Sequence, residues 1–443
     1  MRDKVEDINA KPLATDGSST LWEVSLGLTT VQSKGSLVHI RSTTELRQLI
    51  RLKRRYPLEG IEGAVVDLPI AQRVFNVLKP PPTVAQNGQN TFDGKSIRDA
   101  FTEFSVNHIS LPNPRMEYFY HYRERADTQL RKGYAEIPEA MEYLQEYDSR
   151  INLIERETQA KKEAVRHGLH AEVFFTEDPA RIKRRNTFLG KIMALEHVNF
   201  EYGVAACPRI DADDLQQTAA EDINDTCQGI SYGLGKRCAT YFLYSKNALK
   251  ERKIMDRYFD YVEKQKTRLH ILNFTELDLH DHPDKRARFA FKNVMQRITE
   301  IQNDAPKGQK PHFMLLGAGN QYFIALQAFD FVSSAPTRVD KIIDWSLKRS
   351  QGYWFDETLM YPFAPEDGVT IDRTHCPRCA VMRPSDFQDP RYNQWRREHG
   401  IYDMNNRSLG FRTAIKSNSL GAYLRQHLAA SEFSGYQMMV LTP

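Results

Sequence analysis

Short apolar runs alternate along the chain with segments in which apolar residues recur every three or four positions. Near the start, this pattern predicts a strand at 37–40, a helix at 43–55 and a buried strand at 63–67 that ends on Asp67. Further strand-like runs, with helical patterns between them, lie at 200–206, 229–234, 268–274, 311–316 and 328–333. Such alternation is typical of βαβ units, and the number of units favours a closed barrel over an open sheet. We therefore predict an α/β fold, a (β/α)8 TIM-type barrel.

Two stretches depart from this alternation. Residues 80–135 contain Pro80-Pro81-Pro82 and many Asn and Gly residues, so they read as an irregular insertion. From 137 to about 167 the pattern is helical and strongly charged with apolar residues on one side, which predicts a long surface helix. We expect a loose N-terminal segment at 1–35, the barrel at 36–365 with a helical insertion at about 80–170, and a C-terminal subdomain at 366–443.

The composition is that of an ordinary globular protein. The chain has 443 residues, of which 41% are hydrophobic and 27% charged, so a large core is expected. No stretch reaches the roughly 20 apolar residues that cross a bilayer, and the N-terminus lacks the apolar segment of a signal peptide. Five cysteines are an odd number, which disfavours a disulfide framework. These features predict a cytoplasmic protein without a membrane partner.

Cationic side chains gather in two places although the net charge is only +4. One group is Arg51 with 53–55, and the other is Arg181 with 183–185. Contacts to nucleic-acid phosphates need such grouping. Two solvated helix faces would look the same, and the sequence leaves both interpretations open.

Asp67 is the first candidate for chemistry, because it ends an apolar strand. The carboxyl ends of barrel strands carry catalytic groups, and a carboxylate there is a poor core residue unless it is paired. The alternative is an aspartate that caps the next helix. Glycines at 229–235 and 315–319 would let a flat ligand or a phosphate approach the backbone, although glycine is common in βα turns.

Cys376-Pro-Arg-Cys379 is the second candidate. Two thiolates at this spacing can hold one tetrahedral zinc ion from a tight turn. His375, His399 and His427 are near enough in sequence to complete the shell, and we select His399 as the third ligand. Reduced structural cysteines without a metal are the alternative.

The order of these motifs resembles that of the tRNA-guanine transglycosylase superfamily, which includes relatives that act on DNA in bacteria and phages. Asp67 and Gln72 match the first and last residues of the family's Asp-Ser-Gly-Gly-Phe-Gln. The other matching segments are Val204-Ala-Ala-Cys207, Gly233-Leu-Gly235, Met314-Leu-Leu-Gly317-Ala-Gly319, Phe329-Asp330, Pro336-Thr337-Arg338, Thr374-His-Cys376-Pro-Arg-Cys379 and Asn418-Ser-Leu420. The resemblance spans roughly residues 60–425, but 80–200 contribute almost nothing to it.

The resemblance implies a pentosyltransferase that exchanges guanine for a 7-deazaguanine base in tRNA or DNA. Asp330 would be the nucleophile that forms a covalent Asp–sugar intermediate, and Asp67 would move protons on the bases. The residues that would bind the base are Gln72, Gly233, Leu234, Gly235, Gly317 and Gly319. A second register puts Ser333 at the nucleophile position, and the chain would then be a non-catalytic, zinc-bearing, nucleic-acid-binding paralogue or subunit of such an enzyme.

The resemblance also implies one structural Zn²⁺ ion at Cys376 and Cys379. Thr374 and Asn418 stand where the family has its other cysteine and its histidine ligand, so two of the four ligands are in register. The choice between RNA and DNA, the identity of the deazaguanine and a homodimeric assembly stay open at this point.

Overall fold

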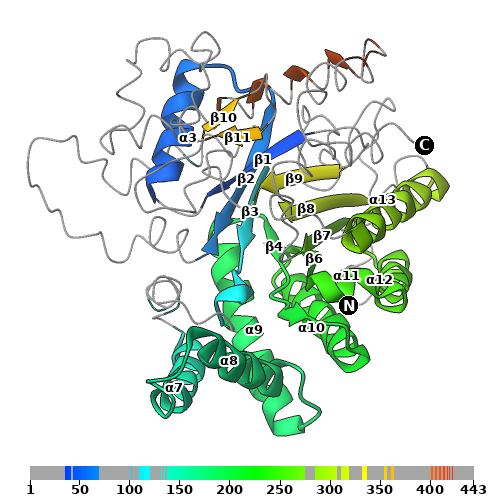
Figure 1. Cartoon of the computed structure of the whole chain (residues 1–443). Coiled ribbons are helices and arrows are strands. Elements are labelled where there is room, and N and C mark those ends of the chain that lie inside the picture. The colour runs from blue at the N-terminus through cyan, green and yellow to red at the C-terminus, as the bar shows by residue number, and fades with distance from the viewer. Residues whose placement is uncertain are drawn as a thin grey trace, which may run out of the picture.

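The computed structural model describes residues 35–40, 43–68, 109–119, 137–274, 285–306, 311–318, 332–336, 354–356 and 361–363. It also describes single residues or pairs at 101, 131, 134 and between 401 and 422. Parallel strands with helices packed around them form the main body (Figure 1). The protein is therefore an α/β protein with a parallel sheet, as the alternating pattern predicts.

The strands of the main sheet all pair in parallel. They are β1 (Gly35–Ile40), β2 (Ile61–Asp67), β3 (Ile109–Asn113), β4 (Tyr202–Val204), β5 (Arg209–Ile210), β6 (Arg237–Tyr244), β7 (Leu269–Phe274), β8 (His312–Ala318) and β9 (Val332–Pro336). Their order across the sheet is β3-β2-β1-β9-β8-β7-β6-β4, and β5 also pairs with β6. The two ends of this order, β3 and β4, lie close to each other in space. A separate antiparallel pair consists of β10 (Trp354–Asp356) and β11 (Tyr361–Phe363).

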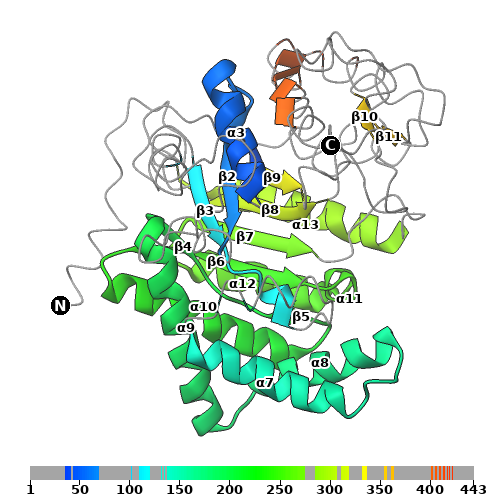
Figure 2. The same cartoon turned by 90° about the vertical axis from the view of Figure 1, so that its left-hand side faces the viewer.

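Helices lie between many of the successive strands in the described part of the chain. Those between strands of the main sheet are α3 (Thr43–Arg55), α7 (Pro138–Asn152), α8 (Gln159–Phe174), α9 (Pro179–Asn199), α10 (Asp214–Gly233), α11 (Lys246–Lys250), α12 (Arg252–Lys264) and α13 (Lys285–Asp304). A short 3-10 helix, η1 (Met116–Phe119), follows β3. Helices α9 and α10 pack on the strands, and α7 and α8 pack outside them on α9 (Figure 2). The connection from β3 to β4 is therefore a helical layer of its own.

Strand β6 is the best example of a buried parallel strand. Its sequence Arg-Cys-Ala-Thr-Tyr-Phe-Leu-Tyr is buried from Cys238 to Tyr244. A parallel strand covered on both faces needs such a continuous apolar run, because neither face meets water. Tyr241, Phe242 and Tyr244 are completely buried there and belong to the large core between the sheet and its helices.

Asn224 on α10 fills a gap beside β6. Strand pairing with β6 ends at Val204 of β4 and begins again at Arg209 of β5, which lies opposite Leu243. Opposite Tyr241, the Asn224 side chain takes the place of a neighbouring strand. Its Oδ1 accepts from the Tyr241 N–H at 2.8 Å, and its Nδ2 donates to the Tyr241 carbonyl at 3.1 Å. The Asn224 side chain thus satisfies the Tyr241 N–H and carbonyl, which have no partner strand between β4 and β5.

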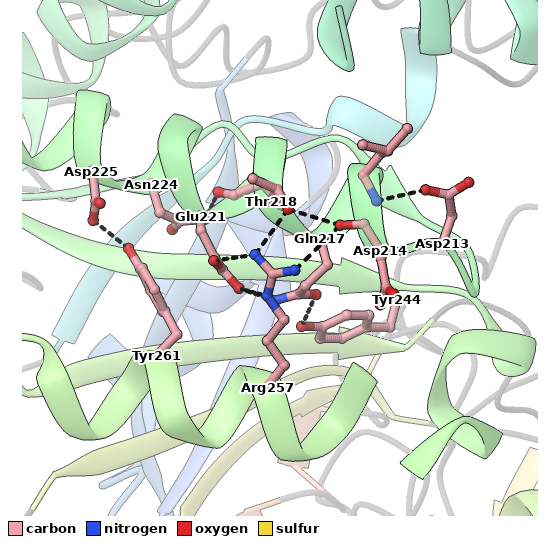
Figure 3. A network of polar contacts seen from close by, with 12 residues as sticks. Asp213, Asp214, Gln217, Thr218, Glu221, Asn224, Asp225, Tyr244, Arg257 and Tyr261 are labelled. Atoms are coloured by element: carbon pink, nitrogen blue, oxygen red, sulfur yellow. Dashed lines mark hydrogen bonds and ion pairs between the residues drawn. The ribbon is translucent and has the colours of Figure 1, made fainter. Parts of the chain in front are cut away.

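Polar contacts also join α10 to α12. Figure 3 shows Arg257 of α12 pointing at α10, where its Nε and Nη2 donate to the two Glu221 carboxylate oxygens at 2.9 and 2.8 Å. In the same view the Tyr261 hydroxyl donates to Asp225 at 2.7 Å. A two-pronged contact of this kind fixes the orientation of the guanidinium better than a single hydrogen bond does.

The sequence pattern is confirmed at the strands around 37–40, 63–67, 200–206, 268–274 and 311–316 and at the helix 43–55. The predicted strand at 229–234 is wrong, because these residues end α10 and the strand follows at 237–244. The predicted long helix from 137 to 167 is also wrong: it breaks at 153–158 into α7 and α8. Strand β3 lies inside the stretch that we expected to be irregular. The last strand-like run, at 328–333, overlaps β9 at its end, and its first four residues lie outside the described part of the chain.

Candidate functional site

Four buried polar residues meet at the carboxyl ends of β1, β2 and β3, and we call them the Asp67 cluster: His39, Asp67, Asn113 and Arg115. The Asp67 Oδ1 lies 2.6 Å from His39 Nε2 and accepts from Asn113 Nδ2 at 3.2 Å. Its Oδ2 lies 3.5 Å from Arg115 Nε. All four residues are nearly inaccessible to solvent, and Asp67 is 2% exposed. The cluster is therefore an extensively paired polar site at the edge of an apolar core.

Strand register explains why these residues meet. Asp67 lies directly opposite Asn113 on β3, and His39 on β1 lies opposite Val65, two residues before Asp67. Side chains two residues apart on a strand share one face, so the imidazole reaches Asp67 on the same face as Asn113. Arg115 follows β3 by two residues and has a φ of 53°, in the left-handed region. Its N–H donates to Asn113 Oδ1 at 3.1 Å.

The Asp67 cluster holds an imidazole and a guanidinium in contact with one carboxylate. A guanidinium beside one carboxylate oxygen stabilises the ionised form of Asp67. The imidazole at the other oxygen can exchange a proton with it, because their contact is 2.6 Å long. Active sites of parallel α/β proteins lie at this edge of the sheet, outside the carboxyl ends of the strands.

A second polar group lies at the same edge. Asp211 follows β5, whose Ile210 is opposite the last residue of β6. Its Oδ2 lies 3.0 Å from Nε2 of His167 on α8, and its Oδ1 accepts from Arg209 Nη2 at 3.2 Å. Burial acts to raise the pKa of Asp211, but the hydrogen bond from His167 and the charge of Arg209 outweigh it and hold the pKa below the usual range. The helical layer thus contacts the carboxyl edge through a histidine.

The predicted base-binding glycines lie at opposite edges of the sheet. Gly317 is at the carboxyl end of β8, where the pairing with β9 shifts between Leu316 and Ala318, so it shares an edge with Asp67. Gly233, Leu234 and Gly235 end α10 and precede β6, which puts them at the amino ends of the strands. Because all these strands are parallel, the three residues cannot share one site with Asp67. Gly235 serves the chain turn instead, with a φ of 70°.

Several predicted site residues fall outside the described part of the chain. They are Gln72, Gly319, Asp330, Cys376, Cys379 and His399. Ser333 is described in its backbone: it pairs with Gly35, four residues before His39 on β1. Four residues of strand span about 13 Å, so the Ser333 backbone lies well before the edge that carries the Asp67 cluster.

Two arginines of the second basic group, Arg184 and Arg185, have partners within the protein. Arg185 is buried and pairs with Asp222, and its Nη1 donates to the Phe174 carbonyl at 3.1 Å. Arg184 pairs with Glu142 at 2.8 Å and lies over the Tyr143 ring. The expectation that residues 181–185 form a phosphate-binding group is therefore wrong for Arg185, because a buried, paired guanidinium cannot reach a phosphate. Arg54, in the last turn of α3, is exposed.

At the amino edge of the sheet, a buried carboxyl group ties α9 to β4. Glu196 is completely buried, and its Oε2 accepts from the Val204 N–H at 2.7 Å. Burial raises the pKa of Glu196 well above its usual value. Gly203 is needed here, since a Cβ at this position would lie 2.8 Å from a ring carbon of His197. This junction connects two elements of the fold and lies away from the Asp67 cluster.

The described cysteines are buried thiols. Cys207, Cys227 and Cys238 are unpaired by disulfides, and burial raises the pKa of Cys227 to about 12. Within the described ranges, no group of three or more His, Cys, Asp or Glu side chains could hold a metal ion. The zinc prediction concerns residues beyond those ranges and stays a prediction.

No known protein family matches the chain, and no curated protein is significantly similar to it. Within the described segments, no helix is both long and apolar enough to cross a membrane. The sequence did not single out His39, Asn113 or Arg115. The only signal for them was polar residues next to apolar runs, in Leu37-Val-His-Ile40 and in Ser110-Leu-Pro-Asn-Pro-Arg115.

Proposed function

We propose that the protein is an enzyme of the guanine transglycosylase type, which exchanges guanine for a 7-deazaguanine base in tRNA or DNA. The observation that carries the proposal is the Asp67 cluster. A carboxylate at the carboxyl end of a parallel strand, in contact with an imidazole and a guanidinium, is suited to proton transfer on a base. Asp67 is also the residue that the motif order assigns to this role.

The proposed architecture is a closed (β/α)8 barrel. Support comes from the strand order: β1 to β3 pair in chain order, β6 to β9 do so too, β4 and β5 both pair with β6, and β9 returns to β1. The two ends of the order, β3 and β4, approach each other. Closure between them would bring the carboxyl ends of all strands around one mouth, with the Asp67 cluster on one side of it.

In the proposed reaction, a carboxylate traps the ribosyl carbon while the departing base takes up a proton. The transition state has oxocarbenium character, so an anionic group at the sugar stabilises it. Asp67, ionised in the resting enzyme, would pass a proton from a protonated His39 to the leaving guanine, and it would then take a proton from the incoming base and return it to His39. The nucleophile assigned by the motif order is Asp330, and Cys376, Cys379 and His399 would hold a structural zinc ion.

A second candidate function is a non-catalytic nucleic-acid-binding paralogue. It is favoured by the observation that both carboxylate oxygens of Asp67 already have partners within the protein. A carboxylate so engaged stabilises the junction of three strands even without a substrate.

The test is a base-exchange assay with labelled guanine, with tRNA and duplex DNA measured side by side. We expect exchange on one of the two substrates and a loss of about 10²- to 10⁴-fold in rate for Asp67→Asn. Glu201→Gln, which neutralises a carboxylate just before β4 at the opposite edge, is the control and should keep full activity. Binding without exchange, unchanged in Asp67→Asn, would favour the paralogue instead.

Binding can be tested separately through its salt dependence. Each phosphate contact that releases a counterion steepens the fall of affinity with salt. Arg54→Glu should weaken binding and lower the salt slope. The matched variant Arg184→Glu should not, because Arg184 is already paired with Glu142. Equal effects of the two variants would contradict the assignment of α3 to the nucleic-acid surface.

A further inference from the structure

Arg115 combines three unfavourable properties. Its backbone has a φ of 53°, where a residue with a Cβ is strained, and it is the one non-glycine residue with positive φ in the described part of the chain. Its side chain is charged and also nearly completely buried. Strain and burial of this kind persist only where the surrounding structure holds the residue in place.

Two side chains from the helical layer and its approach hold the segment around Arg115. The hydroxyl of Tyr134 donates to the Pro114 carbonyl at 2.5 Å. Nε of Arg166 on α8 donates to the Phe119 carbonyl, at the end of η1, at 3.2 Å. Both side chains are completely buried, and we call this pair the Arg115 clamp.

The Arg115 clamp determines where the guanidinium points. Pro114 precedes Arg115, and η1 follows it directly, so fixing both ends leaves the residue between them little freedom. From this position Arg115 Nε lies 3.5 Å from Asp67 Oδ2, while His39 and Asn113 contact Oδ1. Among the described residues, Asp67 thus has contacts from β1, from β3 and from the segment after β3.

We propose that Arg115 is a positioning residue that keeps Asp67 ionised and oriented for proton transfer, and that Tyr134 and Arg166 act through it. This inference rests on the function proposed above. It assigns the helical layer a role in the chemistry, because α8 carries one half of the Arg115 clamp. A turn between β3 and η1 with a purely structural role would need no charged side chain aimed at Asp67.

The experiment compares three variants with the wild-type chain. Arg115→Gln removes the charge, and Tyr134→Phe removes only the hydroxyl that contacts Pro114. Tyr147→Phe is the matched control: Tyr147 on α7 is as buried as Tyr134, its hydroxyl has no hydrogen-bond partner among the described residues, and the variant keeps the ring that lies 5.1 Å from the Arg166 guanidinium. The first measurement is the pH dependence of guanine exchange, and the second is amide hydrogen exchange in the peptide 113–119.

We expect Arg115→Gln to move the acidic limb of the pH–rate profile to higher pH by about one unit, since the ionised carboxylate loses its cation. Tyr134→Phe should move it in the same direction by less, and Tyr147→Phe should leave it unchanged. A rate that falls equally at every pH in Arg115→Gln would overturn the proposal, because only a positioning role moves the limb. The proposal would also be overturned if Tyr147→Phe shifted the acidic limb as far as Tyr134→Phe does.

Hydrogen exchange separates this inference from the proposed function. If the wild-type chain exchanges no guanine, the proposed function fails, and the proton-transfer role of Arg115 fails with it. The Arg115 clamp is still tested: Tyr134→Phe should speed exchange in 113–119 at least about tenfold, because local opening costs less without the Pro114 contact. An unchanged rate of hydrogen exchange in the 113–119 peptide of Tyr134→Phe would overturn the Arg115 clamp even if the enzyme exchanges guanine.

Discussion

Replacing Asn224 by alanine should destabilise the protein strongly, although the residue lies in a helix and alanine has the higher helix propensity. Asn224 is completely buried on α10, and its side chain makes both hydrogen bonds to the Tyr241 backbone, at 2.8 and 3.1 Å. The truncated side chain would reach neither group. The Tyr241 N–H and carbonyl on β6 would then lie buried at the gap between β4 and β5 without a hydrogen-bond partner.

The size of the effect follows from the two backbone groups. A buried donor or acceptor that loses its partner costs about 1–3 kcal/mol, so two cost about 2–6 kcal/mol. The better helix propensity of alanine returns about 0.5 kcal/mol. We therefore expect the free energy of unfolding to fall by about 2–5 kcal/mol. Asn224→Asp keeps the acceptor but puts a buried carboxylate oxygen against the Tyr241 carbonyl, so at neutral pH it should destabilise the protein at least as much as Asn224→Ala.

The assay is urea unfolding, combined with hydrogen exchange of the peptide 237–244 that contains β6. Thr226→Ala on the same helix is the control, because Thr226 is only partly buried and makes no polar contact to β6 among the described residues. Its free energy of unfolding should stay within about 0.5 kcal/mol of wild type. A loss below about 1 kcal/mol in Asn224→Ala, with unchanged exchange in β6, would refute the idea that Asn224 replaces a strand.

Three further outcomes can be measured. Glu196→Gln keeps the acceptor for the Val204 N–H. Because the folded-state pKa of Glu196 is raised, the wild type loses stability as pH rises above about 4.5, by about 1.4 kcal/mol per pH unit. In urea titrations from pH 4 to 7, the free energy of unfolding of the variant should therefore rise relative to that of the wild type, and a constant difference would contradict this. Arg115→Gly should be more stable than Arg115→Ala by about 1 kcal/mol in the same assay, since glycine adopts a φ of 53° freely; the reverse order would exclude strain at this site. Metal analysis should find about one zinc ion per chain that is lost when Cys376 and Cys379 are both changed to serine, and a folded, metal-free wild type would exclude the site.

The sequence alone determined the elements whose signal is local. Helix α3, the strands β1 and β2 and the terminal position of Asp67 follow from periodicity and from a carboxylate that closes an apolar run. The same reasoning failed at 229–234, because a short run with glycines fits a strand end as well as the last turn of α10. Only the longer apolar run at 237–244, which we did not single out, distinguishes the two.

The tertiary structure decided everything that depends on residues far apart in the chain. His39 and Asn113 reach Asp67 across 28 and 46 positions, and no local pattern encodes the register that aligns them. Burial of Arg185 likewise depends on α10, which supplies its partner Asp222. Strand pairing and helix packing are set by the fit of whole surfaces, so a sequence read in short windows shows which residues end strands but not which of them meet.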